Sequence, residues 1–491
     1  MSTPTGRPAP GLEWGGPRRP RRRAVPRWAF FAVLVAVIVA VWLGVRSHSW
    51  QPPSRHVTFV ACHFSDGVTA RCAHVEVPKD PEHSHDGTVS LRVAVLPATR
   101  QPARGALFYL EGGPGAAAID SIARVDSLFA EVGRDRDVVL VDQRGTDGPQ
   151  CPDEHVPAAA ADAVTAYLRR CFARLPSDVT LDSTGVAADD LEAVRRALGY
   201  HRIDVYGVSY GATLAQAFLA RHGSSVRTAT LDSGSLPGVR VFQAEPRNAE
   251  RALALVFARC AASAACRRAY PDPRRELTQL LRRGPRAVTV ETGRVVLTPD
   301  DVAETVAELS QSPDAAATLP YAIHEAARGD YTALGRAFSG DIGSRLDPRA
   351  RLGMVWVELC SESWASLDPV STARAAHGSY LARAAVDRAR LFAQACRVVP
   401  QEREQATFEG SDRPVLLLAG AADPLDPPAN VREYRRLYPD GRLLVVPGGG
   451  HGQLDRPCVE SLVARFVAAG SADDLDASCV RHQPPVPFAI G

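Results

Sequence analysis

Short apolar runs alternate with amphipathic stretches along much of this chain of 491 residues. The apolar runs have the length of buried strands, and several of the stretches between them have helical periodicity. The predicted strands are residues 106–110, 137–141, 203–206, 226–231, 415–418 and 443–446, and the predicted helices are residues 189–198, 212–221 and 459–468. Residues 89–96 alternate as an antiparallel strand does. The pattern predicts an α/β fold with a mostly parallel sheet that helices cover on both faces.

The pattern changes between residues 237 and 405, which are rich in Ala and Arg and mainly helical, with one short hairpin near residues 287–297. We expect this segment to be a cap inserted into the sheet, where it would wall a site at the strand ends. The predicted core is then residues 57–236 and 406–491. An independent helical domain that does not contact the site is the alternative.

The N-terminal region combines positive charge with a long apolar run. Residues 1–27, predicted to be a disordered tail, carry seven arginines against one glutamate. Residues 28–45 are apolar over about the length of one membrane span, and residues 46–56 form a short linker. The positive-inside rule then keeps the tail in the cytoplasm and places the body of the protein outside it. A cleaved signal peptide is the alternative.

The charge of the remaining chain bears on one class of partner. The whole chain has a formal net charge of +2, of which residues 1–27 contribute +6, so the remainder carries −4. A mildly acidic body argues against nucleic acid as a partner. Charge leaves the oligomeric state open.

The ten cysteines fall into couples that are close in sequence. Disulfides suit an exported protein because the compartments outside the cytoplasm are oxidising. Sequence does not fix connectivity, so the pairing is a hypothesis, and free structural thiols are the alternative. The couples are Cys62 and Cys72, Cys151 and Cys171, Cys260 and Cys266, Cys360 and Cys396, and Cys458 and Cys479.

The segment Gly207-Val208-Ser209-Tyr210-Gly211 lies between a predicted strand and a predicted helix. A strand, a sharp turn and a helix are what a nucleophile elbow requires, with serine at the strained centre and glycines where side chains would clash. The pentapeptide also occurs by chance, so the rest of the chain has to decide. We interpret Ser209 as a nucleophile.

Two further side chains complete the chemistry that a serine needs. A serine hydroxyl is a weak nucleophile at neutral pH, and it requires a base and an acid that orients the base. Asp423 follows an apolar strand and His451 lies in a glycine-rich loop after the next one, in the order nucleophile, acid, histidine of α/β-hydrolases. We predict a triad of Ser209, Asp423 and His451, with Asp426 and Asp232 as alternative acids.

The predicted strand at residues 106–110 opens into a tight loop, Gly112-Gly113-Pro114-Gly115. Such a loop can aim a backbone N–H at the oxyanion that forms during acyl transfer. We predict an oxyanion hole made by the backbone N–H groups of Gly113 and Tyr210, the residue after the nucleophile. This chemistry needs no cofactor and no metal, and His324-Glu325 lacks the second histidine of a zinc-peptidase motif.

Together these motifs resemble the prolyl and tripeptidyl aminopeptidase branch of the α/β-hydrolases, over roughly residues 57–482. The resemblance rests on residues 112–115, 142–146, 190–195, 207–211, 423–424 and 450–452. It implies the α/β-hydrolase fold with a helical cap between the sixth and seventh strands. It also implies an exopeptidase that acts on free N-termini, with Ser209, Asp423 and His451 in the roles given above.

The chain departs from this branch in places. Glu111 stands where many members have histidine before the glycine loop, and Asp232-Ser233 stands where Asp-Gly is common. The cap resembles the branch least. Members of the branch bind the substrate amine with cap or loop carboxylates, and Glu362 resembles that element. An ordinary surface glutamate is the alternative for this position.

The leading hypothesis from the sequence is a serine exopeptidase that acts on peptides, tethered to the membrane with its catalytic domain outside the cytoplasm. An esterase or lipase on the same fold is the first alternative, since a fold does not determine a substrate. A catalytically inactive binding protein is the second.

Overall fold

The structure, a computed structural model, describes residues 57–83, 85–147, 151, 161–339, 353–403 and 406–490. The predicted tail, apolar span and linker at residues 1–56 lie outside these residues. Within the described part of the chain, no helix is both long enough and apolar enough to cross a bilayer.

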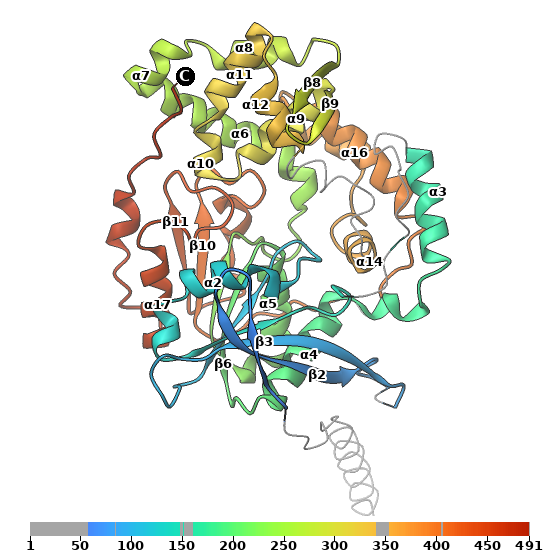
Figure 1. Ribbon diagram of the computed structural model, residues 1–491, viewed down its shortest axis with the longest axis vertical. Helices are drawn as coiled ribbons and strands as arrows, with labels where there is room; N and C mark the ends of the chain where they lie inside the picture. Colours follow the sequence, from blue (N-terminus) through green and yellow to red (C-terminus); the bar gives the residue numbers. More distant parts are fainter. Residues whose placement is uncertain are drawn as a thin grey trace, which may run out of the picture. The chain divides into compact units, whose positions relative to one another are not determined.

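The centre of the fold is a nine-stranded sheet in the order β1-β2-β3-β5-β4-β6-β7-β10-β11 (Figure 1). Its strands are β1 (Val60–His63), β2 (Thr69–Pro78), β3 (Thr88–Leu96), β4 (Ala106–Leu110), β5 (Asp137–Val141), β6 (Ile203–Val208), β7 (Val226–Asp232), β10 (Val415–Gly420) and β11 (Gly441–Val446). The strands from β5 to β11 are parallel, and β1, β2 and β3 add an antiparallel edge. The predicted mostly parallel α/β sheet is therefore confirmed.

Helices cover both faces of this sheet because its central strands are apolar on both sides. All five residues of β4 are buried. Leu107 and Tyr109 of β4 lie in one core cluster with α2 (Ile122–Leu128) and α17 (Val459–Ala469). On the opposite side, α5 (Tyr210–His222) packs on β4, β6 and β7 and on its neighbour α4 (Thr184–Ala197).

The segment between β7 and β10 leaves the sheet and returns beside the strand that it left, since these two strands pair in parallel. Its elements are α6 (Val241–Ala262), α7 (Ala264–Ala269), α8 (Pro273–Leu280), β8 (Arg286–Val290), β9 (Gly293–Leu297), α9 (Pro299–Leu309), α10 (Pro313–Ala316), α11 (Leu319–Arg328), α12 (Thr332–Ala337), α14 (Gly353–Ser361), α15 (Pro369–Ala375) and α16 (Ala382–Ala395). The strands β8 and β9 form the predicted hairpin. Figure 1 shows α6 to α12 gathered beyond the ends of β10 and β11.

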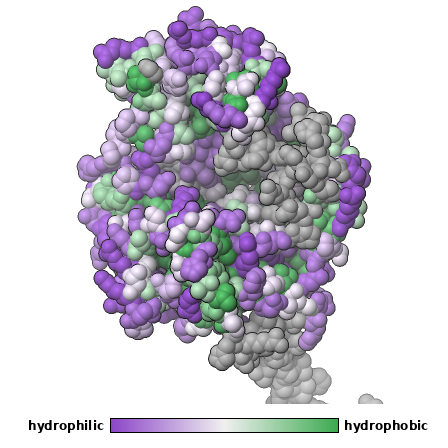
Figure 2. Space-filling view, in the orientation of Figure 1, coloured by the Kyte–Doolittle hydropathy of each residue, from purple (hydrophilic) through white to green (hydrophobic). Residues whose placement is uncertain are grey.

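One helix from the first part of the chain joins the inserted helices. The helix α3 (Ala161–Phe172) packs against α16, and Tyr167 and Leu168 share a buried cluster with Val357 and Phe392. On the face shown in Figure 2, hydrophilic residues are spread over both parts of the molecule, and apolar residues form small groups between them.

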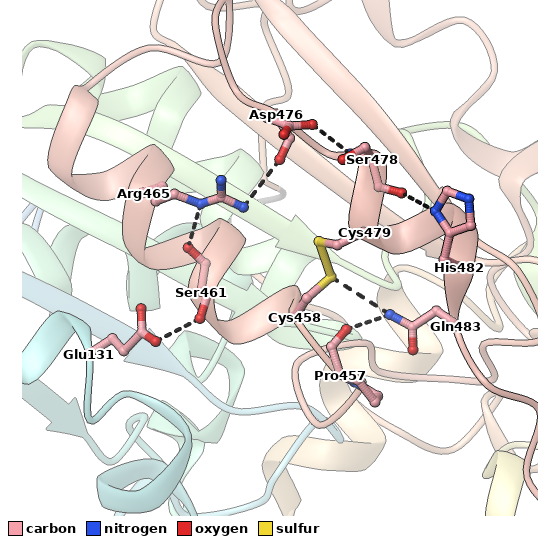
Figure 3. The surroundings of a disulfide bond; sticks show 10 residues. All are labelled: Glu131, Pro457, Cys458, Ser461, Arg465, Asp476, Ser478, Cys479, His482 and Gln483. Atoms are coloured by element: carbon pink, nitrogen blue, oxygen red, sulfur yellow. Dashed lines mark hydrogen bonds between the residues drawn. A yellow bond between two sulfur atoms is a disulfide. The ribbon is translucent and has the colours of Figure 1, made fainter.

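The five cysteine couples expected from the sequence are the five disulfides of the structure, and no cysteine is free. This number of disulfides indicates an oxidising, extracytoplasmic compartment. The last of them joins Cys458, before α17, to Cys479 (Figure 3). Beyond it, Gln483 donates to the Pro457 carbonyl, and the chain continues to the inserted helices, where Arg259 of α6 donates to the Val486 carbonyl at 2.9 Å.

Candidate active site

Ser209 lies in the sharp turn between β6 and α5, as the sequence predicted. Its backbone has φ 56° and ψ −124°, a conformation that costs a non-glycine residue about 1–3 kcal/mol. The Ser209 N–H donates to the Asp232 carbonyl at 2.9 Å, which ties the strained turn to the end of β7. The sheet therefore stabilises this strained conformation, which directs the serine side chain away from the strand.

The two glycines of the turn are required by close backbone contacts. A Cβ atom at Gly207 would lie 2.1 Å from the carbonyl oxygen of Gly211. A Cβ atom at Gly211 would lie 2.2 Å from the carbonyl oxygen of Leu110, on the neighbouring strand β4. Both separations are far below van der Waals contact, so only glycine fits either position.

The loops after β10 and β11 bring an imidazole and a carboxylate to Ser209. The Nε2 atom of His451 lies 2.9 Å from Ser209 Oγ, and its Nδ1 atom lies 3.0 Å from Asp423 Oδ2. The three side chains form one hydrogen-bonded chain although they come from three different loops. This is the geometry in which an imidazole can take a proton from a serine hydroxyl.

The Asp423 carboxylate is fully buried and held by its own loop. Its Oδ1 atom accepts the backbone N–H groups of Leu425 at 2.8 Å and Asp426 at 2.9 Å. These bonds leave Oδ2 directed at His451. A carboxylate fixed in this way sets which imidazole nitrogen carries the proton.

The two alternative acids have other partners. Asp426 Oδ2 is 3.9 Å from His451 Nδ1, and its Oδ1 accepts the Ser235 hydroxyl. Asp232 accepts the Tyr206 hydroxyl at 2.5 Å and the Gln453 N–H at 2.8 Å. The structure therefore places Asp423, and not Asp232 or Asp426, within hydrogen-bond distance of the imidazole.

The surroundings of His451 favour its charged form. Burial lowers the pKa of the imidazole, but Asp423, and then Asp426 and Asp232, raise it more, to about 9. Burial raises the pKa of Asp232 to about 6. The imidazole is thus surrounded by carboxylates that would stabilise the imidazolium formed when it accepts a proton.

The glycine loop after β4 lies directly against the serine. A Cβ atom at Gly112 would lie 3.1 Å from Ser209 Cβ, and Gly113 has φ 122°. Glu111 holds this loop, because its carboxylate accepts the Gly112 N–H at 2.9 Å and the Tyr109 hydroxyl at 3.0 Å. The glutamate at this unexpected position thus has a structural explanation.

Glu362 lies in a cluster of carboxylates beside Tyr210, the residue that follows Ser209. Glu358, one turn earlier on α14, is 1% exposed and accepts the Thr184 hydroxyl at 2.6 Å. The Thr184 hydroxyl also lies 2.9 Å from the Tyr210 hydroxyl. Glu402 is near both glutamates, since their charges raise its pKa. We call Glu358, Glu362 and Glu402 the carboxylate cluster.

The carboxylate cluster has more acceptors than donors. Within the described chain, Glu358 Oε2, Glu362 Oε1 and both carboxylate oxygens of Glu402 are buried without a hydrogen-bond partner. Burial, above all, raises the pKa of Glu362 to about 7 and that of Glu402 to about 9, and it raises the pKa of Glu358 well above its ordinary value. Such a cluster is suited to binding a cation that can donate several hydrogen bonds.

Sequence reasoning missed two members of this cluster. Glu358 was detectable, because it lies on the apolar helix α14 four residues before Glu362, which directly follows that helix, and a spacing of four residues brings side chains together across a helical turn. Glu402 carries no comparable signal, since it is distant in sequence and comes near only through the fold.

Comparison with known proteins relates the chain to hydrolases. A family model of the alpha/beta hydrolase fold matches residues 105–455. The tripeptidyl aminopeptidase of Streptomyces coelicolor is 31% identical over 187 residues, 33% of this chain and 35% of that protein. The serine protease Hip1 of Mycobacterium bovis is 26% identical over 288 residues, which are 51% of this chain and 55% of that protein. Carboxylesterase B of Mycobacterium tuberculosis is 34% identical over 163 residues, which are 33% of this chain and 29% of that protein. The chain thus spans about a third to a half of each relative's length.

Proposed function

The chain belongs to the alpha/beta hydrolase fold family, and on that premise we propose that it is a serine hydrolase that works through an acyl-enzyme. The observation that carries this proposal is the hydrogen-bonded chain from Ser209 through His451 to Asp423. In the first step, His451 Nε2 takes the proton of Ser209 Oγ as this oxygen bonds to the substrate carbonyl carbon. The carbonyl π electrons move to its oxygen, which becomes the oxyanion.

The intermediate then collapses in favour of the leaving group. We assign the backbone N–H groups of Tyr210 and Gly113 as donors to the oxyanion. Their hydrogen bonds stabilise its negative charge in the transition state. When the oxyanion re-forms the carbonyl, the bond to the leaving group breaks, and His451 gives this group its proton. Water repeats the sequence on the acyl-serine and regenerates the free hydroxyl. Asp423 stays ionised throughout and orients the imidazole.

For the substrate, we propose peptides with a free N-terminus. A terminal ammonium group carries a positive charge and three N–H donors, which match the buried acceptors of the carboxylate cluster. Glu358 connects through the Thr184 hydroxyl to the hydroxyl of Tyr210, the residue that follows the nucleophile, and this contact supports placing the bound amine on the Tyr210 side of the site. The relatives named as a tripeptidyl aminopeptidase and a serine protease support this choice.

A carboxylesterase is the second candidate function. It is favoured by the 34% identity to the relative named carboxylesterase B, which is no lower than the identity to the named peptidases. An esterase would use the same three side chains but would have no need for the carboxylate cluster. Substrates with and without a free amine therefore separate the two functions.

The first experiment tests the nucleophile. The protein is incubated with a fluorophosphonate probe, and we expect covalent labelling that is lost in Ser209→Ala. Labelling that persists in this variant would reject Ser209 as the nucleophile. Absence of labelling in the wild-type protein would reject the serine hydrolase and leave a non-catalytic binding protein as the better explanation.

The second experiment tests the amine. Chromogenic peptides are compared with their N-acetylated forms, and we expect cleavage of the free forms only. Glu362→Gln should raise KM for the free peptides, while Glu409→Gln, an exposed glutamate outside the cluster, should not. Equal cleavage of both forms, or cleavage of acyl esters alone, would favour the esterase.

We further propose that residues 28–45 tether this enzyme to the membrane, with its catalytic domain outside the cytoplasm. The disulfides support the compartment, and the apolar run supports the tether. Recovery of the full-length chain in washed membranes would agree with an anchor. Release of a shortened chain into the medium would instead indicate signal cleavage.

A further inference from the structure

The helix α6 binds the loop that carries Asp423. Arg251 on α6 donates from Nη1 to the Ala421 carbonyl at 2.6 Å and from Nη2 to the Asp423 carbonyl at 3.2 Å. Asn248, almost one turn earlier, directs its side-chain amide at the Leu425 carbonyl, 3.4 Å away. One face of this inserted helix therefore contacts three carbonyl groups of the loop at residues 421–425.

The same inserted segment also contacts the histidine loop. The backbone N–H of His451 donates to the carbonyl of Gln311, just after α9, at 2.6 Å. A Cβ atom at Gly450 would lie 1.9 Å from this carbonyl oxygen, so the two backbones approach as closely as glycine allows. The segment between β7 and β10 thus supports both the acid and the base of the proposed triad.

Arg251 is placed to control where the Asp423 carboxylate lies. The loop between Gly420 and Asp426 has little regular structure, and Asp423 meets His451 through a single oxygen. Its carboxylate is held by N–H groups on one side, from Leu425 and Asp426. The guanidinium holds the carbonyl of the same residue and that of Ala421 on the other side. Two donors held in one planar group constrain the positions of both carbonyl groups together.

We propose that Arg251 is a positioning residue for the hydrolytic reaction, acting through the backbone of residues 421–423 on the alignment of Asp423 with His451. This inference rests on the proposed function. Its consequence is that the inserted segment does more than cover the site, because it supplies part of the framework that sets the triad geometry. A misplacement of about 1 Å in a catalytic group can cost about 10²-fold in rate.

The test compares substitutions at Arg251 with one at Arg247, an exposed arginine one turn earlier on α6. Turnover of a small neutral acyl ester and the rate constant of fluorophosphonate labelling are measured for Arg251→Ala, Arg251→Lys and Arg247→Ala, with Tm as a check of folding. We expect Arg251→Ala to lower kcat and the labelling rate constant roughly tenfold with KM unchanged, since misplacement by a fraction of an ångström costs about this factor. Arg247→Ala should match the wild type.

A purely structural role is separated from positioning by chemical rescue. The Arg251 side chain is exposed, so guanidinium added far below denaturing concentrations can occupy the vacated position in Arg251→Ala. We expect added guanidinium to restore part of the turnover of Arg251→Ala and to leave the turnover of Arg247→Ala unchanged. We expect Arg251→Lys to fold and to have an activity between those of the wild type and Arg251→Ala.

Three results would overturn the inference. These are equal labelling rate constants in Arg251→Ala and Arg247→Ala, a change in KM alone, and a folded Arg251→Ala that guanidinium does not rescue. If Arg251→Ala does not fold, the folded Arg251→Lys decides, and wild-type kcat in that variant would count against the proposal. A wild-type protein that the probe does not label would instead reject the proposed function.

Discussion

Asp232 and Asp423 follow neighbouring parallel strands, yet only the carboxylate of Asp423 meets the imidazole of His451. Asp232 ends β7 and is fully buried, and its oxygens accept from Tyr206 and Gln453. Asp423 lies three residues beyond the end of β10, and this extra length of loop carries its carboxylate to Nδ1 at 3.0 Å. The position of an acid relative to its strand end thus decides which of two similar residues can serve the base.

The first prediction concerns this pair of acids. Asp423→Asn should lower kcat by about 10³- to 10⁴-fold, because an amide in place of the carboxylate favours the wrong imidazole tautomer. Asp232→Asn should keep kcat within a few-fold of the wild type, although it should lower Tm because a buried hydrogen-bonded carboxylate is lost. Steady-state kinetics and thermal unfolding of both variants check this. A larger loss of kcat in Asp232→Asn than in Asp423→Asn would contradict the assignment.

The contact between Asp423 and His451 also predicts a pH effect. His451 acts as a base only when neutral, and the carboxylates around it raise its pKa to about 9. As the pH is lowered, kcat/KM should therefore begin to fall at a pH well above the ordinary pKa of a histidine. Since Asp423 is the largest of the charges that raise this pKa, the acidic limb in Asp423→Asn should move to lower pH. An unmoved limb would show that another group controls it.

The second prediction concerns the glycine of the elbow that faces β4. In Gly211→Ala, the added methyl carbon would lie 2.2 Å from the carbonyl oxygen of Leu110 and would collide with it. Overpacking against rigid backbone costs at least about 1–3 kcal/mol, so we expect a large fall in Tm and loss of probe labelling. The control is Gly133→Ala, where the new atom meets nothing within 4 Å. Similar Tm values for the two variants would contradict the described turn.

The third prediction concerns the disulfide between Cys360 and Cys396. It closes a separation of 36 residues and joins α14, which carries Glu358 and ends just before Glu362, to the end of α16. In the chain-entropy model its removal costs about 3–4 kcal/mol, against about 2 kcal/mol for the short loop between Cys260 and Cys266.

Double alanine variants of each pair, unfolded in denaturant, would measure this difference. We also expect the long-loop variant to raise KM for free peptides, because α14 loses its tether. A long-loop variant with unchanged stability and unchanged KM would show that α14 is held by packing alone.

The fourth prediction concerns Glu402 and stability. Burial, and then repulsion from Glu362 and Glu358, raises its pKa from 4.5 to about 9 in the folded protein. The folded state therefore binds this proton more tightly than the unfolded state, and the resulting stabilisation is complete below about pH 4.5. It is lost as the pH rises towards 9, so the free energy of unfolding should fall over this interval.

Glu402→Gln removes the titrating group and should flatten this fall, so its stability relative to the wild type should be greater at pH 8 than at pH 5. Denaturant unfolding at both values measures it, with Glu409→Gln as the exposed control. Parallel pH profiles for the wild type and Glu402→Gln would show that Glu402 does not titrate in this range.

The sequence was informative where structure is local. Parallel strands buried on both faces are continuous apolar runs, so β4, β5, β6, β7 and β10 could be located from their sequence pattern. The edge strand β11 is partly exposed, but its apolar run at residues 443–446 located it as well. The elbow at Ser209 was visible because strand, turn and helix are adjacent in the chain. The disulfides were predictable for the same reason, since each joins cysteines that are near in sequence.

The rest depends on contacts between distant segments. The edge strands β1 and β2 are partly exposed and mix apolar with polar residues, so they lack a clear apolar run. The helix α3 meets α16 only because the chain folds back over more than two hundred residues. The encounter of Glu402 with Glu358, and that of Arg251 with the Asp423 loop, likewise has no counterpart in local pattern.

The return of the chain from β7 to the adjacent β10 has a consequence for protein engineering. Because the two strands that bound the inserted segment are neighbours in the sheet, a different insert could be grafted between them without altering the strand order. Such a graft would also delete the guanidinium that grips residues 421–423 and the carbonyl that receives the His451 amide. A chimaera that changes selectivity while keeping turnover would therefore have to carry equivalent anchoring groups of its own.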